Sequence, residues 1–189
     1  MPKVIDDKNV YRSVIDVLVT HGYESATTLK IAETAGIHEA TLFRKYGSKL
    51  NLVRLAIQAH FQDVPFAKVT YTGDLQTDLN AILQAYLETS ELVGDILPIL
   101  LVEIPRNPEL KDALETPWKN ILQVSDILAQ YQAQGVLRKE PVLNSITILI
   151  GPLMARHMIE NADPNISIPP MELQEYIDGF LHGRLITAP

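Results

Sequence analysis

Apolar and polar residues alternate along most of the chain with the period of an α-helix. Apolar residues recur every three or four positions, and no segment shows the every-second-residue alternation of a half-buried strand. The breaks in the pattern carry glycine, proline, asparagine or serine, which are typical of turns. The sequence therefore predicts an all-α fold, with helices over approximately residues 8–21, 27–35, 38–45, 49–62, 75–93, 95–105, 108–134, 141–161 and 170–185.

The first four predicted helices are short and are separated by glycine. Gly22, Gly36 and Gly47 follow the first three, as expected for a residue that adopts the left-handed conformation at a helix end. Thr27 or Thr28 can cap the second helix, as Ser48 can cap the fourth, because hydroxyl side chains accept hydrogen bonds from the free N–H groups there.

Charge is distributed unevenly along the 189 residues, whose 16 Lys+Arg and 23 Asp+Glu give a net charge of −7. Residues 1–62 hold eight basic and six acidic side chains, a net +2, so residues 63–189 carry −9. Such asymmetry is typical of a nucleic-acid-facing module joined to an acidic body. With the segment from Pro65 to Gly73 as the joint, we expect a DNA-binding domain over 1–62 and a second domain over 63–189.

The stretch TTLKIAETAGIHEATLFRKYGSK, residues 27–49, has the spacing of a helix-turn-helix. Such a unit needs a small residue where the helices cross, a glycine in the turn and an apolar anchor on the second helix. Ala32, Gly36 and Leu42 supply these. The second helix can then enter a major groove about 12 Å wide.

Exposed positions on and around the second helix are candidate DNA contacts. Arg44 can bind guanine O6 and N7, Thr41 a base edge or phosphate, and Glu39 a cytosine amino group. Lys45, Lys49 and the helix starts at 27–28 and 48–49 suit phosphates. The alternative is a hairpin that only packs, with its charges solvated. The full set of candidates is Thr27, Thr28, His38, Glu39, Ala40, Thr41, Phe43, Arg44, Lys45 and Lys49.

The block from Gly22 to Phe61, with its FRKYGSK signature, resembles the N-terminal DNA-binding domain of TetR-family transcriptional regulators, and the resemblance covers about residues 8–62. It implies that Thr27 and Thr28 contact phosphate, that residues 38–45 form the recognition helix, and that Lys49 grips phosphate.

Three positions depart from the family pattern. The family usually has Gly, Tyr and His where this chain has Ala40, Phe43 and Lys45. Phe43 lacks the hydroxyl that would bind a phosphate, while Lys45 adds a charge that compensates. The operator sequence therefore does not transfer from relatives.

The resemblance also implies a C-terminal helical domain that dimerises and binds a small molecule. Residues 141–159 are apolar on nearly all faces, and such a helix is expected to be buried on all sides. Together with the last helix it would form a four-helix interface in a homodimer, unless both helices lie in one protomer's own core. The predicted interface residues are Leu149, Leu153, Met154, Ile177, Phe180 and Leu181.

Helical positions with bulk or polarity in the second domain are candidates for a small-molecule pocket. Glu103 interrupts an apolar run, and a buried carboxylate needs a partner. Arg156 is the candidate partner, in either a structural salt bridge or a ligand-sensing pair. Trp118 is equally interpretable as a core or lid aromatic. The pocket candidates are Tyr86, Ser90, Leu100, Glu103, Trp118, Leu122 and His157.

Other classes of protein lack support in the sequence. Without cysteine there is no disulfide scaffold, Cys-ligated zinc or thiol sensor. The five histidines lack metal-binding spacing, and GxSxG, P-loop and dinucleotide motifs are missing. The start is too polar for a signal peptide, and the apolar stretches 96–104 and 146–155 are shorter than the ~20 residues of a membrane span. We expect a cytoplasmic protein that is no enzyme and has no cofactor, metal or membrane partner.

These patterns predict a homodimeric, ligand-responsive transcriptional regulator. We expect a repressor that a small molecule releases from a pseudo-palindromic double-stranded DNA operator; the sequence does not separate a repressor from an activator. The alternative is a helical dimer that binds a small molecule or a protein and has no DNA function.

Overall fold

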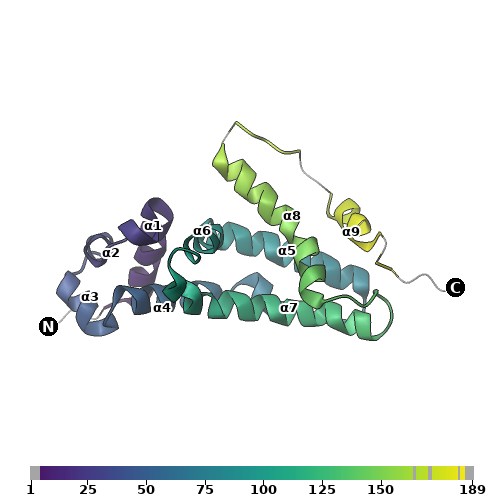
Figure 1. Ribbon diagram of the computed structural model, residues 1–189, viewed down its shortest axis with the longest axis horizontal. Helices are drawn as coiled ribbons and strands as arrows, with labels where there is room; N and C mark the ends of the chain where they lie inside the picture. The colour runs from purple at the N-terminus through teal and green to yellow at the C-terminus, as the bar shows by residue number, and fades with distance from the viewer. Residues whose placement is uncertain (1–4, 164, 170–171, 183, 186–189) are drawn as a thin grey trace. The chain divides into compact units, whose positions relative to one another are not determined.

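The computed structural model describes residues 5–163, 165–169, 172–182 and 184–185, and these are predominantly helical (Figure 1). Within the described residues the only β pairing is an isolated bridge between Leu137 and Leu185. The predicted all-α fold is confirmed. In chain order the elements are α1 (Asp7–Ser25), α2 (Thr28–Ala35), α3 (Glu39–Tyr46), α4 (Lys49–Phe61), the 3-10 helix η1 (Pro65–Lys68), α5 (Leu75–Val93), α6 (Ile96–Glu103), the 3-10 helix η2 (Pro108–Leu114), α7 (Glu115–Ala133), α8 (Val142–Ala162) and α9 (Leu173–Leu181).

The chain forms two compact units, and each is described by itself. Unit 1 comprises the described residues of Met1–Asp63 and Val93–Trp118. Unit 2 comprises the described residues of Val64–Leu92 and Lys119–Pro189. The unit boundaries therefore fall twice within long helices, at the end of α5 and in the first turn of α7.

Residues 93–118 belong to a different unit from the one expected, since the sequence placed them in a continuous domain over 63–189. In the structure α6 packs against α1, and η2 packs against α4. This packing buries Leu100 and Leu110 almost completely. Apolar burial between segments far apart in the sequence thus brings this part of the chain to α1 and α4.

Local hydrogen bonds fix the ends of the helices in unit 1. Asp6, Thr27 and Ser48 each accept a hydrogen bond from a backbone N–H in the first turn of α1, α2 and α4, at 3.0, 3.2 and 3.1 Å. The predicted cap at Ser48 is confirmed, and Thr27 rather than Thr28 caps α2. The first helix was expected to end before Gly22, but it continues to Ser25 through a kink at that glycine, where φ is 70° and ψ is 171°.

The apolar core of unit 1 lies where α1 packs against α2 and α4. Removing a fully buried aliphatic side chain of this kind costs about 2–5 kcal/mol, because a cavity replaces close packing. This core holds the short helices α2 and α3 in place, since isolated helices of eight residues are not stable in water. Its fully buried side chains include Val14, Leu18, Ile31, Leu52, Val53 and Ile57.

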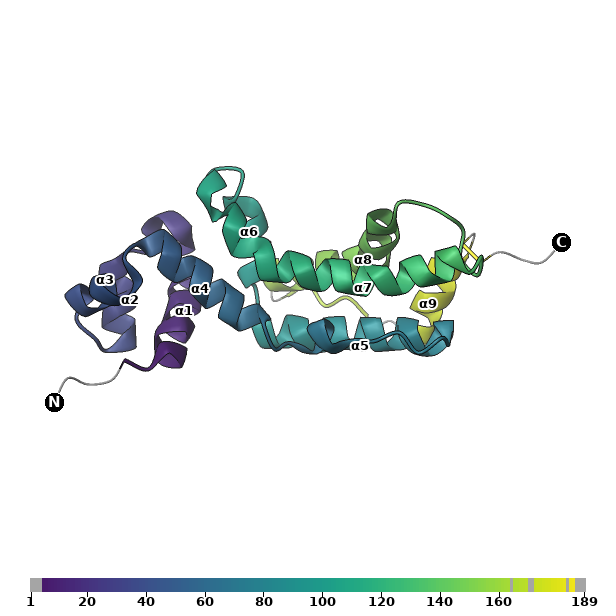
Figure 2. The ribbon, with the colours of Figure 1, turned by 90° about the horizontal axis from the view of Figure 1, so that it is seen from below.

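Unit 2 is built from most of α5 and α7 together with α8 and α9. Figures 1 and 2 both show α5 and α7 running side by side. The hydroxyl of Tyr176 on α9 donates to the carbonyl of Leu149 on α8 at 2.7 Å, and so joins these two helices. The buried side chains of unit 2 include Leu79, Ile82, Leu83, Val124, Leu128, Ile146, Leu149 and Ile177.

Helix α8 is more extensively apolar than the sequence pattern indicated. Among the described residues it is the one helix long and apolar enough to cross a membrane, by length and composition only. Within this helix Arg156 and Glu160 lie one turn apart and form an ion pair at 3.0 Å. Only 22% of an 18-residue apolar stretch of this helix is buried in the protomer. The core helix of a soluble protein can have the same length and composition, so these two properties alone do not identify a membrane-spanning helix.

A buried carboxylate joins α5 to α7 in unit 2. Asp78 is almost fully buried and accepts hydrogen bonds from the Thr72 backbone N–H at 3.1 Å, the Thr72 hydroxyl at 2.6 Å and the Tyr131 hydroxyl at 2.5 Å. Burial acts to raise the pKa of the Asp78 carboxyl, but these hydrogen bonds outweigh it and hold the pKa below its usual value. The ionised form therefore stabilises the fold.

We predict that Asp78→Asn lowers the free energy of unfolding by about 1–3 kcal/mol at neutral pH, because the amide leaves donors of this network unsatisfied. A carboxyl whose pKa is lowered by folding contributes stability above its unfolded pKa of about 3.9 and loses it as the pH falls through the folded pKa. The difference in the free energy of unfolding between the variant and the wild type should thus shrink below about pH 4. Urea denaturation followed by circular dichroism measures both effects.

The matched control is Asp126→Asn, which neutralises an exposed aspartate on α7. It should shift the denaturation midpoint little at any pH. An equal effect of both substitutions would contradict a specific role for the Asp78 network.

Candidate nucleic-acid interface

The α2–turn–α3 unit has the geometry that its sequence predicts. Gly36 adopts the left-handed conformation with φ at 67°, and the N–H of Ile37 donates to the carbonyl of Ala32 at 3.0 Å, which ends α2. Ala32 and Leu42 are each about 1% exposed. The expected roles of small crossing residue, turn glycine and apolar anchor are confirmed.

One face of α3 is turned away from the core of unit 1. Leu42 and Tyr46 are buried, whereas most of the other α3 side chains are exposed. Phe43 stands out among these, because 47% of a large apolar side chain is exposed. An exposed aromatic on such a helix suits apolar contact with a thymine methyl group. The predicted contacts His38, Ala40, Phe43, Arg44 and Lys45 are exposed, while Glu39 and Thr41 are half-buried.

The hydroxyl of Thr28 donates to Oε1 of Glu39 at 2.5 Å. Thr28 is the first residue of α2 and Glu39 the first residue of α3, so the bond joins the starts of both helices. A carboxylate in this position is favoured by the partial positive charge of helix N-termini. Two residues that were predicted as separate DNA contacts are therefore in contact with each other.

Lys45 is held by an acidic residue of α1. Its ammonium forms an ion pair with Asp7, and the hydroxyl of the buried Tyr46 also donates to Asp7. The hydrogen bond from Lys45, and then that from Tyr46, lower the pKa of the Asp7 carboxyl, while burial and the bond to Asp7 raise the pKa of Tyr46. A cation on the α3 surface is thus neutralised within unit 1.

Lys49 takes a role different from the one expected. Its ammonium donates to the carbonyl of Tyr23 at 2.5 Å and lies 4.1 Å from the centre of the Tyr23 ring. Burial lowers the pKa of the Lys49 ammonium. Lys49 was expected to grip phosphate; in the structure its charge joins the start of α4 to the end of α1.

The partners of Glu103 and of Arg156 lie close to each of these residues in the sequence. Glu103 on α6 accepts a hydrogen bond from the Asn107 side chain at 3.1 Å. If another residue replaced Gly22, its Cβ would lie 3.1 Å from Oε1 of Glu103. Arg156 instead pairs with Glu160 and donates to the backbone carbonyls of residues 168 and 169. Each charge is satisfied by groups close to it in sequence, whereas the predicted pairing assumed a distant partner.

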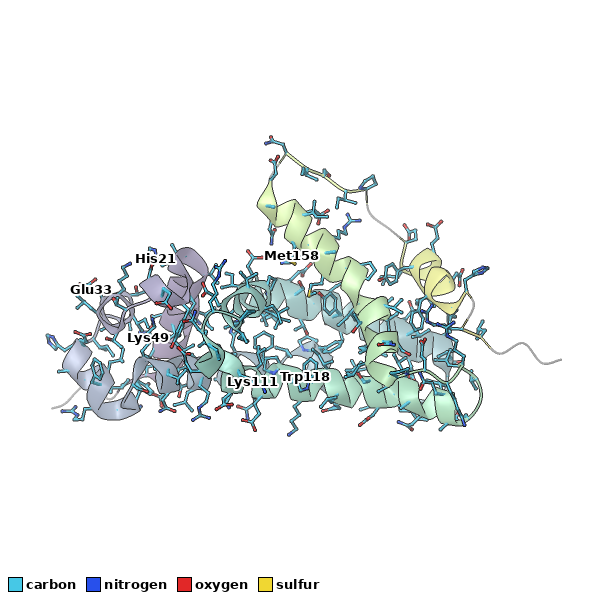
Figure 3. The ribbon with its side chains drawn as sticks, in the orientation of Figure 1. His21, Glu33, Lys49, Lys111, Trp118 and Met158 are labelled. Carbon is cyan, nitrogen blue, oxygen red and sulfur yellow. The ribbon has the colours of Figure 1, made fainter. Side chains whose placement is uncertain are left out.

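The predicted pocket residues are divided between the two units. Leu100, Glu103 and Trp118 belong to unit 1, and Tyr86, Ser90, Leu122 and His157 to unit 2. Leu100 is fully buried, whereas Trp118, which is labelled in Figure 3, is 50% exposed. Leu122 is also exposed, whereas Tyr86, Ser90, Glu103 and His157 are half-buried.

Two tyrosines of unit 2 have hydroxyl groups with a raised pKa. Tyr86 packs edge-on against Phe66, with 6.0 Å between ring centres. Burial raises the pKa of Tyr86 to about 12, with a smaller contribution from Tyr176, and burial also raises the pKa of Tyr176 to about 12. These hydroxyls are therefore neutral donors at physiological pH. Across the described residues, no group of three or more His, Asp or Glu side chains is arranged to hold a metal ion.

The residues predicted to form a dimer interface lie mostly in the protomer's own core. The helix was expected to be buried on all sides, but α8 buries one face and leaves another apolar face exposed. That exposed face carries Ile148, Met158 and Ile159. Of the predicted set, Leu149, Leu153, Ile177, Phe180 and Leu181 are buried and Met154 is half-buried.

Asp7 and Tyr23 are site residues that sequence reasoning missed. An aspartate at the start of a helix is ordinarily explained by the helix dipole, so nothing in the sequence connected Asp7 with Lys45, 38 residues away. No motif in the sequence connected Tyr23 with Lys49, 26 residues away. Both contacts depend on how α1 crosses α3 and α4.

Comparisons with known proteins agree with this geometry. The sequence model of the family described as bacterial regulatory proteins, tetR family, matches residues 15–56. A Bacillus subtilis protein named as an HTH-type transcriptional regulator is 27% identical over 175 residues, which is 90% of this chain and 92% of the relative. Both parts of the chain therefore align with a relative of similar length.

Solved structures share the fold over nearly the whole chain. A TetR family transcriptional regulator from Thermus thermophilus has a TM-score of 0.63 at 17% identity and covers 92% of this chain and 97% of its own. A protein named Flavonoid-responsive Regulator has a TM-score of 0.67 at 20% identity and covers 96% of this chain and 98% of its own. The match of residues 15–56 assigns the helix-turn-helix to the tetR family of bacterial regulatory proteins, and the chain as a whole is similar in sequence to an HTH-type transcriptional regulator.

Proposed function

We propose that the protein is a dimeric repressor that binds a pseudo-palindromic operator through α3 and is released by a small molecule. The observation that supports this most directly is the outward face of α3, where Phe43 and Arg44 are exposed while Leu42 anchors the helix in the core. Arg44 provides the bidentate donor that recognises guanine, and Phe43 contacts a thymine methyl group. Such a protein acts in the cytoplasm, where operator DNA is accessible.

A dimer is needed because one α3 reads only a few base pairs. Two copies related by twofold symmetry would present two α3 helices to half-sites about 34–36 Å apart. The exposed face of α8 suits this contact: Ile148, Gly151, Ala155, Met158 and Ile159 recur at intervals of three or four residues and so share one side of the helix. A contiguous exposed apolar surface of this kind indicates an interaction site.

Release by an effector follows from linkage. A ligand shifts the operator equilibrium only if it binds the form that does not fit the operator more tightly than the form that does. TetR-family regulators bind small-molecule effectors as well as operators, and we assign the effector to the domain over 63–189. Occupying an operator is sufficient to block transcription, whereas activation needs a further contact with the polymerase, which favours repression.

We predict that Arg44→Ala weakens operator binding by about five- to 150-fold, because it removes a bidentate base contact. Gel-shift titration against DNA flanking the gene, at several salt concentrations, measures the loss. The control is Arg106→Ala, which removes an equal charge from an exposed position of unit 1 outside α2 and α3. If wild-type protein shifts no DNA at low salt, the dimer without DNA function becomes the better interpretation.

We predict that Asp7→Asn tightens operator binding about two- to fivefold, because it frees the Lys45 ammonium for phosphate. One additional phosphate contact steepens the plot of log binding constant against log salt concentration by about 0.9. The control Asp6→Asn removes the same charge from the neighbouring position, and asparagine preserves the helix cap. Equal effects of the two substitutions would attribute the change to net charge and not to the ion pair.

We predict that Ile148→Glu or Met158→Glu converts the dimer to a monomer and abolishes tight operator binding. Both side chains are more than 40% exposed in the protomer, so the fold is retained while charged groups enter the proposed interface. Sedimentation velocity and circular dichroism measure these two properties. Val136→Glu alters an exposed apolar residue of unit 2 outside α8 and should leave the dimer intact; a dimer that survives all three substitutions refutes the assignment.

A further inference from the structure

The contact between Thr28 and Glu39 changes what each residue is able to do on DNA. A threonine hydroxyl has a single proton to donate. That proton is engaged with Oε1 of Glu39 at 2.5 Å, so Thr28 cannot donate to a phosphate at the same time. The carboxylate of Glu39, which contacts Thr28 at the start of α2, would also repel a phosphate there.

Thr27 remains suited to the phosphate role in place of Thr28. Its oxygen accepts a hydrogen bond from the Lys30 N–H at 3.2 Å, so its own proton stays available. Thr27 is exposed and Thr28 is half-buried. Two adjacent threonines, which appear equivalent in the sequence, therefore differ in chemistry.

Glu39 lies where base contacts are made. It is the first residue of α3, and the first turn of a recognition helix is the part that contacts base edges in the major groove. One carboxylate oxygen is fixed by Thr28, which leaves the other to accept from a donor. Cytosine presents only its N4 amino donor in the major groove. Adenine presents the N7 acceptor beside its N6 donor, and guanine and thymine present acceptors, and each acceptor repels a carboxylate.

We propose that Thr28 is a positioning residue that orients Glu39, and that the pair selects cytosine at one position of each half-site. This inference rests on the proposed function, since it assumes that α3 enters the major groove. It differs from the family-based expectation for Thr28, which was a sequence-independent phosphate contact. It also differs from a purely structural role, in which the bond only joins α2 to α3.

The test is operator selection from randomised double-stranded DNA with full-length wild type, Thr28→Val, Thr28→Ser and Glu39→Gln. Valine keeps the shape of threonine without the hydroxyl, and serine keeps the hydroxyl. Thr28→Val and Glu39→Gln should each reduce the preference for cytosine at the same position by about five- to tenfold, whereas Thr28→Ser retains it. The double variant Thr28→Val/Glu39→Gln should lose no more than Glu39→Gln alone, because the two residues act as one unit.

Salt titration and thermal unfolding distinguish a positioning role of Thr28 from a phosphate contact and from a structural bond. Our inference requires that Thr28→Val leave the salt dependence and the affinity for non-selected DNA unchanged. A uniform loss of affinity with a shallower salt slope would establish a phosphate contact. A lower melting temperature with unchanged base preference would establish a structural bond. Either result overturns this inference and leaves the proposed function standing. Wild-type protein that selects no DNA at low salt overturns the proposed function and this inference with it.

Discussion

The close crossing of α2 and α3 is the constraint on which the rest of unit 1 depends. The chain reverses between two eight-residue helices through Gly36, whose left-handed conformation is accessible to glycine at little cost. Ala32 and Leu42 fill the space that this turn creates, and both are buried. The outward direction of Arg44 and Phe43 is a consequence, because burying Leu42 and Tyr46 leaves the opposite side of α3 exposed.

Polar contacts then determine which side chains of this surface are available. Lys45 is neutralised by Asp7, Lys49 is engaged with the carbonyl and ring of Tyr23, and Thr28 donates to Glu39. The sequence alone would give three phosphate-binding groups at these positions. In the proposed function, DNA binding therefore depends more on Arg44, Phe43 and the helix starts than the content of basic residues indicates.

Residues 93–118, which lie outside the predicted DNA-binding domain, form part of unit 1. Residues 93–118 pack on α1 and α4 within unit 1, and Glu103 approaches the kink at Gly22. A glycine is required at that kink because φ is positive and a Cβ would closely approach the Glu103 carboxylate. Unit 1 is therefore assembled from two separate stretches of sequence.

The sequence by itself determined the helical fold, the helix ends at Gly36 and Ser48, and the helix-turn-helix with its anchors, because periodicity, caps and turn glycines act over a few residues. It did not determine the partners of Asp7, Glu103 or Arg156, nor which face of α8 is buried. A helix that is apolar on nearly all sides carries no signal that distinguishes its core face from its exposed face. Only the tertiary structure decided these points, since long-range packing and ion pairing depend on how distant helices meet.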